Sequence, residues 1–184
     1  MDAAKIVSKI SKEHGIIKNV YFLACGGSLV DLYPGYYFVR AESAVMDAQW
    51  IPAREFALTP PKKLGKDSLL IICSHSGKTK ECLEAAKVGM DAGAAVVTMT
   101  HAPGSPCDCE EWISVVYDWA PGVKEAQKPQ GIVLDILNEL MKAQEPGYTL
   151  YNSIKEGFEK IDDIIAEAVK KQQNSAWLFA EKYY

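Results

Sequence analysis

The sequence lacks the glycine-rich signatures of nucleotide binding. A G-x-G-x-x-G motif could begin at Gly26, but Ser28 and Asp31 stand where its second and third glycines would fall. Gly77-Lys78-Thr79 ends like a P-loop, yet Ile72 occupies the place of the first glycine of that motif. These absences argue against a dinucleotide site and against a nucleoside triphosphate site.

Long apolar runs and basic blocks are also missing. No apolar run among the 184 residues approaches the roughly 20 residues that cross a bilayer, and residues 1–5 lack the hydrophobic region of a signal peptide. The net charge is −4, from 20 Lys and Arg against 24 Asp and Glu. We therefore expect a cytoplasmic protein that binds neither a membrane nor nucleic acid.

The five cysteines do not form a metal-binding pattern. Cys107 and Cys109 make one C-x-C pair, without a second pair and without a His at zinc spacing. Cys25 and Cys73 end apolar runs, and Cys82 lies in a helical pattern, as is typical of small buried side chains. We expect no metal site, and a reducing compartment suits these thiols.

What the chain does contain is an alternation of apolar runs and amphipathic segments. Continuously apolar runs such as 20–24 are typical of strands buried on both faces of a parallel sheet. Their alternation with helical patterns predicts an α/β fold, a doubly wound, five-stranded parallel sheet flanked by helices. The expected strands are 19–25, 49–56, 68–73, 94–100 and 113–117, and the expected helices are 2–14, 28–42 (interrupted near Pro34), 78–92 and 131–142.

A long amphipathic stretch follows the break at Pro146-Gly147 and runs from Leu150 to about Lys182. Its apolar residues recur at steps of three and four, which predicts a helix with one apolar face. We expect a domain over residues 1–147 and a helical extension over residues 148–184. The extension is too apolar for a loose linker, so it should pack on its own domain, on a second subunit or on a further part of the protein.

One polar turn, Ser74-His75-Ser76-Gly77-Lys78-Thr79, separates a buried strand from a helix. The first N–H groups of a helix have no partner within it, and its N-terminus carries partial positive charge. Hydroxyls around such an end form a site for phosphate or another anion. Gly77 allows close approach of the backbone or a positive φ. Plain helix capping is the alternative interpretation, and this turn alone does not decide between the two.

Polar residues follow the other expected strands as well. Gly26-Gly27-Ser28 follows the first strand, Glu55 lies at the end of the second, Thr100-His101 end the fourth, and the loop 121–130 follows the fifth. Doubly wound sheets bind ligands at the carboxyl ends of their strands, where the strand order reverses. The placement of these residues predicts a small anionic ligand at that edge.

The two turns resemble the sugar isomerase (SIS) family, in which a strand ends in a Gly-Ser-rich sequence and a later Ser-x-Ser-Gly-x-Thr opens a helix. The resemblance covers roughly residues 16–110. Residues 21–28, Arg54-Glu55-Phe56, Pro60-Pro61 and Leu64-Gly65 resemble the fructosamine-6-phosphate deglycase branch, in its amino-terminal SIS half. The resemblance implies a flavodoxin-like three-layer sandwich and a phosphorylated sugar or sugar–amino acid conjugate as ligand. It implies no metal and no redox cofactor.

The resemblance also implies site residues. The substrate-binding residues would be Gly26, Gly27, Ser28, Ser74, His75, Ser76, Gly77, Lys78, Thr79 and Thr100, with the phosphate in the second turn and the sugar beside the first. The catalytic Glu and His of this branch lie in a second-half motif, Gly-Glu-Phe…His-Gly-Pro, which this chain does not contain. Glu125 and His75 are the candidates for proton transfer within the chain.

Three functions stay open. The first is the amino-terminal half of a fructosamine-6-phosphate deglycase, a protein that releases glucose 6-phosphate and an amino acid; this half would bind substrate without turnover. The second is a single-domain aldose–ketose phosphosugar isomerase that assembles its site from several subunits, with Glu125 or a neighbour's His as base. The third is a non-enzymatic phosphosugar sensor. In each case we expect a homo-oligomer, a dimer or larger, formed through apolar helices.

Overall fold

The computed structural model describes residues 2–183, and they form one parallel sheet with the strand order β2-β1-β3-β4-β5. This order confirms the doubly wound topology, because the chain steps outward from β1 to β2 and then returns past β1 to β3. The strand order therefore reverses between β1 and β3. The strands are β1 (Asn19–Ala24), β2 (Asp47–Pro52), β3 (Ser68–Cys73), β4 (Ala95–Thr100) and β5 (Ile113–Val116).

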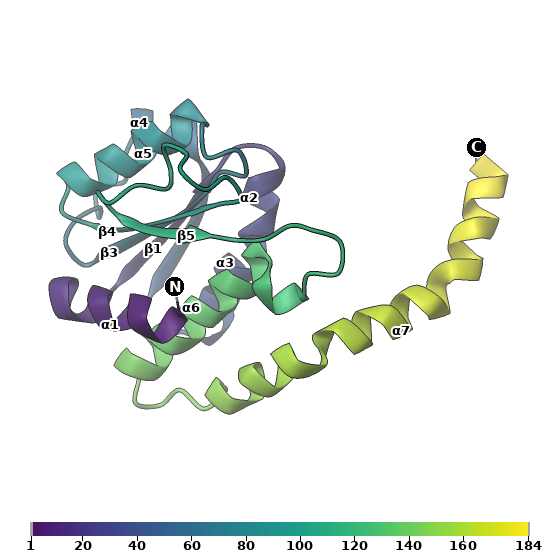
Figure 1. The fold of residues 1–184 in the computed structure, drawn as a ribbon. Helices are drawn as coiled ribbons and strands as arrows, with labels where there is room; N and C mark the ends of the chain where they lie inside the picture. The colour runs from purple at the N-terminus through teal and green to yellow at the C-terminus, as the bar shows by residue number, and fades with distance from the viewer. Residues whose placement is uncertain (1, 184) are drawn as a thin grey trace.

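Helices cover both faces of the sheet, which gives three layers (Figure 1). On one face lie α1 (Ala3–His14), α2 (Gly27–Asp31), α3 (Tyr33–Glu42) and α6 (Pro129–Gln144), and on the other lie α4 (Ala53–Leu58) and α5 (Lys80–Asp91). Successive side chains of a strand point to opposite faces. Phe22 of β1 accordingly packs in the hydrophobic core on the side of α1, α2, α3 and α6. Tyr21 and Leu23 pack in the core on the side of α4 and α5.

The ends of the first three helices follow their sequence signals. Asp2 caps α1 by accepting a hydrogen bond from the N–H of Ala4, and Gly15 ends this helix with φ 75°. The helix expected over 28–42 is interrupted at Leu32, which divides it into α2 and α3. Pro34 lies in the first turn of α3, where its missing N–H costs no helical hydrogen bond.

Two predicted boundaries were wrong. The strand expected over 49–56 spans Asp47–Pro52, and Glu55 lies in the first turn of α4 instead of at a strand end. The fixed φ and missing N–H of Pro52 end the strand. The helix expected from Lys78 begins at Lys80, with Thr79 as its N-cap, so Lys78 belongs to the polar turn.

The carboxyl-terminal extension is a single helix, α7 (Tyr151–Tyr183), whose first turns are fixed to α6. Lys155 Nζ lies 2.5 Å from Asp135 Oδ1 and 2.8 Å from Glu139 Oε1, and the hydroxyl of Tyr151 also donates to Glu139. Burial alone would lower the pKa of Lys155, but the hydrogen bonds to both carboxylates raise it. The start of α7 is thereby held by charge-assisted hydrogen bonds.

The rest of α7 runs away from the sheet (Figure 1), and the helix buries no residue. Within residues 2–183, no helix combines the length and apolar content that a bilayer crossing requires. The expected packing of the apolar face of α7 stays a prediction. The domain boundary between residues 147 and 148 also stays a prediction. The large apolar side chains that α7 exposes are Ile164, Ile165, Val169, Trp177, Leu178, Phe179 and Tyr183.

Candidate functional site

The two polar turns lie side by side at the carboxyl edge of the sheet. Strands β1 and β3 are hydrogen-bonded neighbours, and Ala24 pairs with Cys73 at their ends. Gly26-Gly27-Ser28 and residues 74–79 leave the sheet from these two positions, where the strand order reverses. The prediction that both turns share one edge is confirmed.

Two carbonyl groups of the turn 74–79, those of His75 and Gly77, are bonded to the end of β4 and the loop that follows it. The His75 oxygen accepts hydrogen bonds from the N–H of His101 (3.2 Å) and from Thr100 Oγ1 (3.3 Å). The Gly77 oxygen accepts from the N–H of Cys107 (3.0 Å), which belongs to the loop after β4. The negative ends of these peptide dipoles are therefore bonded to β4 and its loop, beneath the turn.

Several N–H groups of the same turn are left without a partner. Among residues 2–183, no acceptor is found for the N–H groups of His75, Ser76 and Thr79. They adjoin the N-terminus of α5, where the first N–H groups of the helix lack intrahelical acceptors. Unpaired N–H groups close to a helix N-terminus can donate hydrogen bonds to an anion.

The hydroxyls of the turn have different roles. Ser76 and Lys78 are exposed, and Ser76 Oγ accepts a 3.3 Å hydrogen bond from the Lys78 N–H. Ser74 is buried and donates to Thr79 Oγ1 at 2.8 Å, so it orients Thr79. Thr100 is fully buried, and its bond to the His75 carbonyl makes it a support beneath the turn.

A cluster of rings borders the turn on the β5 side. The ring of His75 stacks on His101 with centroids 5.0 Å apart, and its Nδ1 lies 3.0 Å from the Tyr117 hydroxyl. Trp119 meets the His75 ring edge-on at 5.8 Å. Burial raises the pKa of Tyr117, so its hydroxyl stays neutral near pH 7. With Nδ1 held in this way, Nε2 is the ring atom of His75 that remains for a ligand.

Glu125, the other candidate for proton transfer, is already paired. Its carboxylate forms an ion pair with Lys128, and its N–H donates to Asp162 Oδ1 of α7 at 3.0 Å. Lys128 also lies over the Trp119 ring, 5.9 Å from the centroid. These contacts connect the 3₁₀ turn η1 (Glu125–Gln127) to both α7 and the ring cluster.

Sequence reasoning missed Asp31 at this edge. Asp31 of α2 accepts a 2.7 Å hydrogen bond from Gln130 Nε2 of α6. Burial raises its pKa, and the nearby His75 opposes this shift. The one sequence signal for Asp31 was its position one helical turn after the Gly26-Gly27-Ser28 turn.

The thiols near the site are chemically protected. Burial raises the pKa of Cys73 to about 12 and that of Cys107 to about 11, and it also raises the pKa of Cys82. Cys25 and Cys109 are half-buried. Residues 2–183 contain no group of three or more His, Cys, Asp or Glu side chains arranged to hold a metal ion.

Thiol titration checks this environment. At pH 8, Ellman's reagent should modify Cys25 and Cys109 of the folded protein much faster than the three buried cysteines, because the reactive thiolate is scarce at a raised pKa. Addition of guanidinium should then release all five thiols. Equal, fast reaction of all five in the native state would contradict the described burial.

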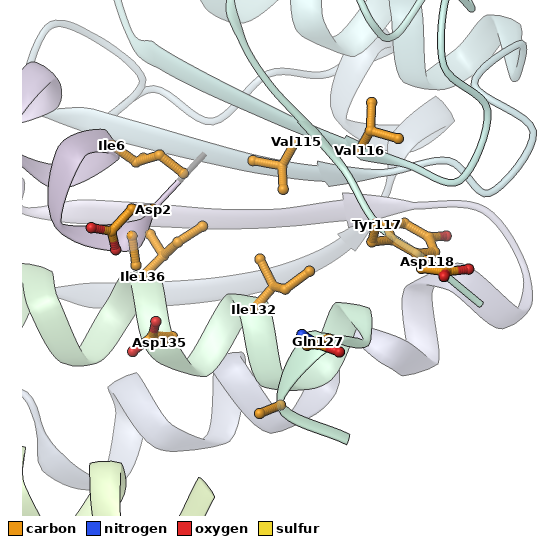
Figure 2. Close-up of a pocket in the computed structure, with 12 residues that line it drawn as sticks. Asp2, Ile6, Val115, Val116, Tyr117, Asp118, Gln127, Ile132, Asp135 and Ile136 are labelled. Atoms are coloured by element: carbon orange, nitrogen blue, oxygen red, sulfur yellow. The ribbon is translucent and has the colours of Figure 1, made fainter. Parts of the chain in front are cut away.

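A separate hollow of about 490 Å³ lies between α1, the edge strand β5 and α6 (Figure 2). Ile6, Val115 and Ile132 contribute apolar surface, and Asp2 and Asp135 contribute carboxylates. No residue of the turns 26–28 or 74–79 lines this hollow. It is therefore separate from the two polar turns, although Tyr117, whose hydroxyl lies 3.0 Å from His75 Nδ1, lines one side of it.

Comparison with known proteins finds similar chains and similar folds, although no protein-family model matches the chain. The chain is 32% identical to the fructosamine deglycase FrlB of Bacillus subtilis strain 168, over 91% of this chain and 51% of the relative. A crystal structure of a candidate phosphosugar isomerase from Salmonella typhimurium LT2 superposes with a TM-score of 0.90 at 32% identity, over 99% of this chain and 55% of that one. The chain belongs to the sugar isomerase (SIS) domain family.

A second solved structure supports the same assignment for this SIS domain. A candidate phosphosugar isomerase from Bacillus subtilis superposes with a TM-score of 0.87 at 29% identity, over 98% of this chain and 57% of that one. Superpositions of this extent include α7, so the projecting helix is shared with these structures. The SIS domain spans about half the length of the relatives it matches.

Proposed function

We propose that this SIS domain binds the phosphoryl group of a phosphorylated sugar in the turn 74–79. The observation that supports this most directly is the orientation of the turn, in which the carbonyls of His75 and Gly77 are bonded inward while N–H groups at the start of α5 remain unpaired. The exposed Ser76 and Lys78 add a hydroxyl and a positive charge beside these groups. A phosphoryl group supplies the negative oxygens that such donors require.

The sugar would extend from this turn toward Gly26-Gly27-Ser28, which leaves the neighbouring strand end. On the β5 side, His75 presents its ring at the same edge, with Nδ1 fixed by Tyr117. Within this chain it is the group best placed to move a proton during opening of a sugar ring. Glu125 is less suited to act as a base, because its carboxylate is paired with Lys128.

The parent activity that fits best is that of a fructosamine-6-phosphate deglycase, with this chain as the amino-terminal SIS half. Similarity to the fructosamine deglycase FrlB over about half of that protein supports this proposal. Such an enzyme moves a proton between adjacent carbons next to an imine or carbonyl. Water then hydrolyses the resulting C=N bond, which releases glucose 6-phosphate and an amino acid. The second half would supply the Glu and His of that step.

Substitution of Ser76 tests phosphoryl binding. Ser76→Ala should weaken binding of glucose 6-phosphate by roughly 1–3 kcal/mol, the loss expected for one hydrogen bond to a charged group. Isothermal titration calorimetry measures this change, with Ser8→Ala on the exposed side of α1 as the control that should bind like the wild type. Unchanged affinity would remove Ser76 from the site, and a wild-type chain that binds no phosphosugar would contradict the proposed function.

A further inference from the structure

The loop 117–128, which follows β5, brings a tryptophan against the ring of His75. Trp119 of this loop meets the His75 ring edge-on, with centroids 5.8 Å apart. The same His75 ring stacks on His101 and is bonded through Nδ1 to the hydroxyl of Tyr117. Trp119 is 43% exposed, so its neighbours in the ring cluster do not enclose it. Its position therefore depends on what holds the loop.

Lys128 connects Trp119 to the 3₁₀ turn η1 near the end of the loop. Its Nζ lies 5.9 Å from the centroid of the Trp119 ring, within the range of a cation–π contact. The same amine forms an ion pair with the carboxylate of Glu125, the first residue of η1. The position of η1 thus determines where Lys128 meets the ring of Trp119.

η1 is itself held by both α6 and α7. A Cβ on Gly131 of α6 would come within 2.5 Å of Ala126 Cα, so the backbones of α6 and η1 are in direct contact. From α7, Asp162 Oδ1 accepts the hydrogen bond of the Glu125 N–H at 3.0 Å. The first N–H groups of a helical turn lack an acceptor within it, and Lys124 at the N-cap carries only a donor. Asp162 therefore supplies from another helix the acceptor that a capping side chain normally provides.

We propose that Asp162 is a positioning residue of the phosphosugar site, which acts on His75 through the loop 117–128. This inference rests on the proposed function and extends it to a residue of α7. Loss of the Asp162 carboxylate leaves the Glu125 N–H without this acceptor and loosens η1 together with Lys128. Trp119 then loses its cation, and the ring of His75 loses the neighbour that limits its rotation. The helix α7 thereby takes part in ligand binding without a residue of its own in the polar turns.

Substitutions at two neighbouring aspartates test this role by isothermal titration calorimetry. Asp162→Ala should bind glucose 6-phosphate about fivefold more weakly, because His75 Nε2 is no longer held in one orientation. Asp162→Asn keeps an oxygen acceptor for the Glu125 N–H and should bind like the wild type. Asp163→Ala is the matched control, since it removes the same charge from the next, exposed position of α7 and should also bind like the wild type.

A double-mutant cycle separates positioning from a general loss of stability. If Asp162 acts through Trp119, Asp162→Ala should cause no further loss of affinity in a Trp119→Ala protein, whereas independent effects would add. Ser68→Ala is the stability control. Ser68 is buried at the opposite end of β3, where its Oγ accepts from the N–H of Gly65 at 3.1 Å. This variant should melt at a lower temperature and keep its affinity for glucose 6-phosphate.

The outcomes are distinct. Weaker binding by Asp162→Ala, recovery in Asp162→Asn and non-additivity with Trp119→Ala together support the inference. Unchanged affinity of Asp162→Ala, additive effects in the cycle, or an equal loss in any of Asp162→Asn, Asp163→Ala and Ser68→Ala overturns it while the proposed function stands. If the wild type itself binds no glucose 6-phosphate, the proposed function fails and the inference fails with it.

Discussion

Gly77→Ala is expected to abolish detectable phosphosugar binding and to lower the free energy of unfolding by roughly 2–5 kcal/mol. Gly77 has φ 63°, a left-handed conformation that an alanine adopts at a cost of about 1–2 kcal/mol. The added Cβ would also overlap Ser105 Oγ and lie 2.5 Å from Ser105 Cβ. Relief of this overlap requires the turn to lift from β4, and the unpaired N–H groups proposed to bind the phosphoryl group would then move apart. Urea unfolding and calorimetric titration measure the two effects.

Gly93→Ala is the control for the backbone contribution. Gly93 also has a positive φ, 79°, but a Cβ there would have no neighbour within 4 Å, and the residue ends α5 far from the turn. This variant should lose only about 1–2 kcal/mol of stability and keep its affinity. If Gly77→Ala behaved like Gly93→Ala in both measurements, the close contact between the turn and Ser105 would be refuted.

Gly131→Ala is expected to destabilise the protein by roughly 2–4 kcal/mol. Gly131 lies in the first turn of α6, where a Cβ would come within 2.5 Å of the Ala126 Cα and of the Glu125 oxygen. Both atoms belong to the backbone of η1, so no rotation of a side chain can make room. Urea unfolding measures the loss, and the fluorescence of Trp119, which contacts Lys128 beside η1, should report the displaced loop.

A glycine-to-alanine substitution in α7 should have the opposite effect and stabilise the helix. Gly157 is exposed within α7, and a Cβ there would have no neighbour within 4 Å. Alanine is favoured over glycine in a helix interior by about 1 kcal/mol, so Gly157→Ala should increase helicity by circular dichroism at 222 nm. Equal stability losses for the two variants would show that the contact between α6 and η1 is not as described.

The sheet and the two polar turns at its carboxyl edge could be predicted from the sequence because their signals are local. Residues 20–24 and 69–73 are continuously apolar, as strands buried on both faces must be, and all six residues of each of β1 and β3 are buried. The turn 74–79 was recognisable because a glycine and three hydroxyls fall between a buried strand and a helical pattern. Parallel strands then place such turns at one edge without further information.

Other parts of the site depend on contacts that no local pattern encodes. The prediction did not include the contact of Ser105 with Gly77 or that of Asp31 with Gln130, since each pair joins residues that are distant in sequence. The direction of α7 likewise depends on Lys155 meeting Asp135, and periodicity says only that the helix has an apolar face.

The inward hydrogen bonds of the turn have a consequence for folding. The oxygens of His75 and Gly77 are satisfied by groups from β4 and the loop behind it, which lie 25 or more positions further along the chain. The turn therefore reaches this conformation only in molecules where two non-adjacent segments have already associated. A ligand that binds only this conformation of the turn would stabilise the central strands as one cooperative unit. Hydrogen exchange would then slow at backbone amides of these strands that do not contact the ligand.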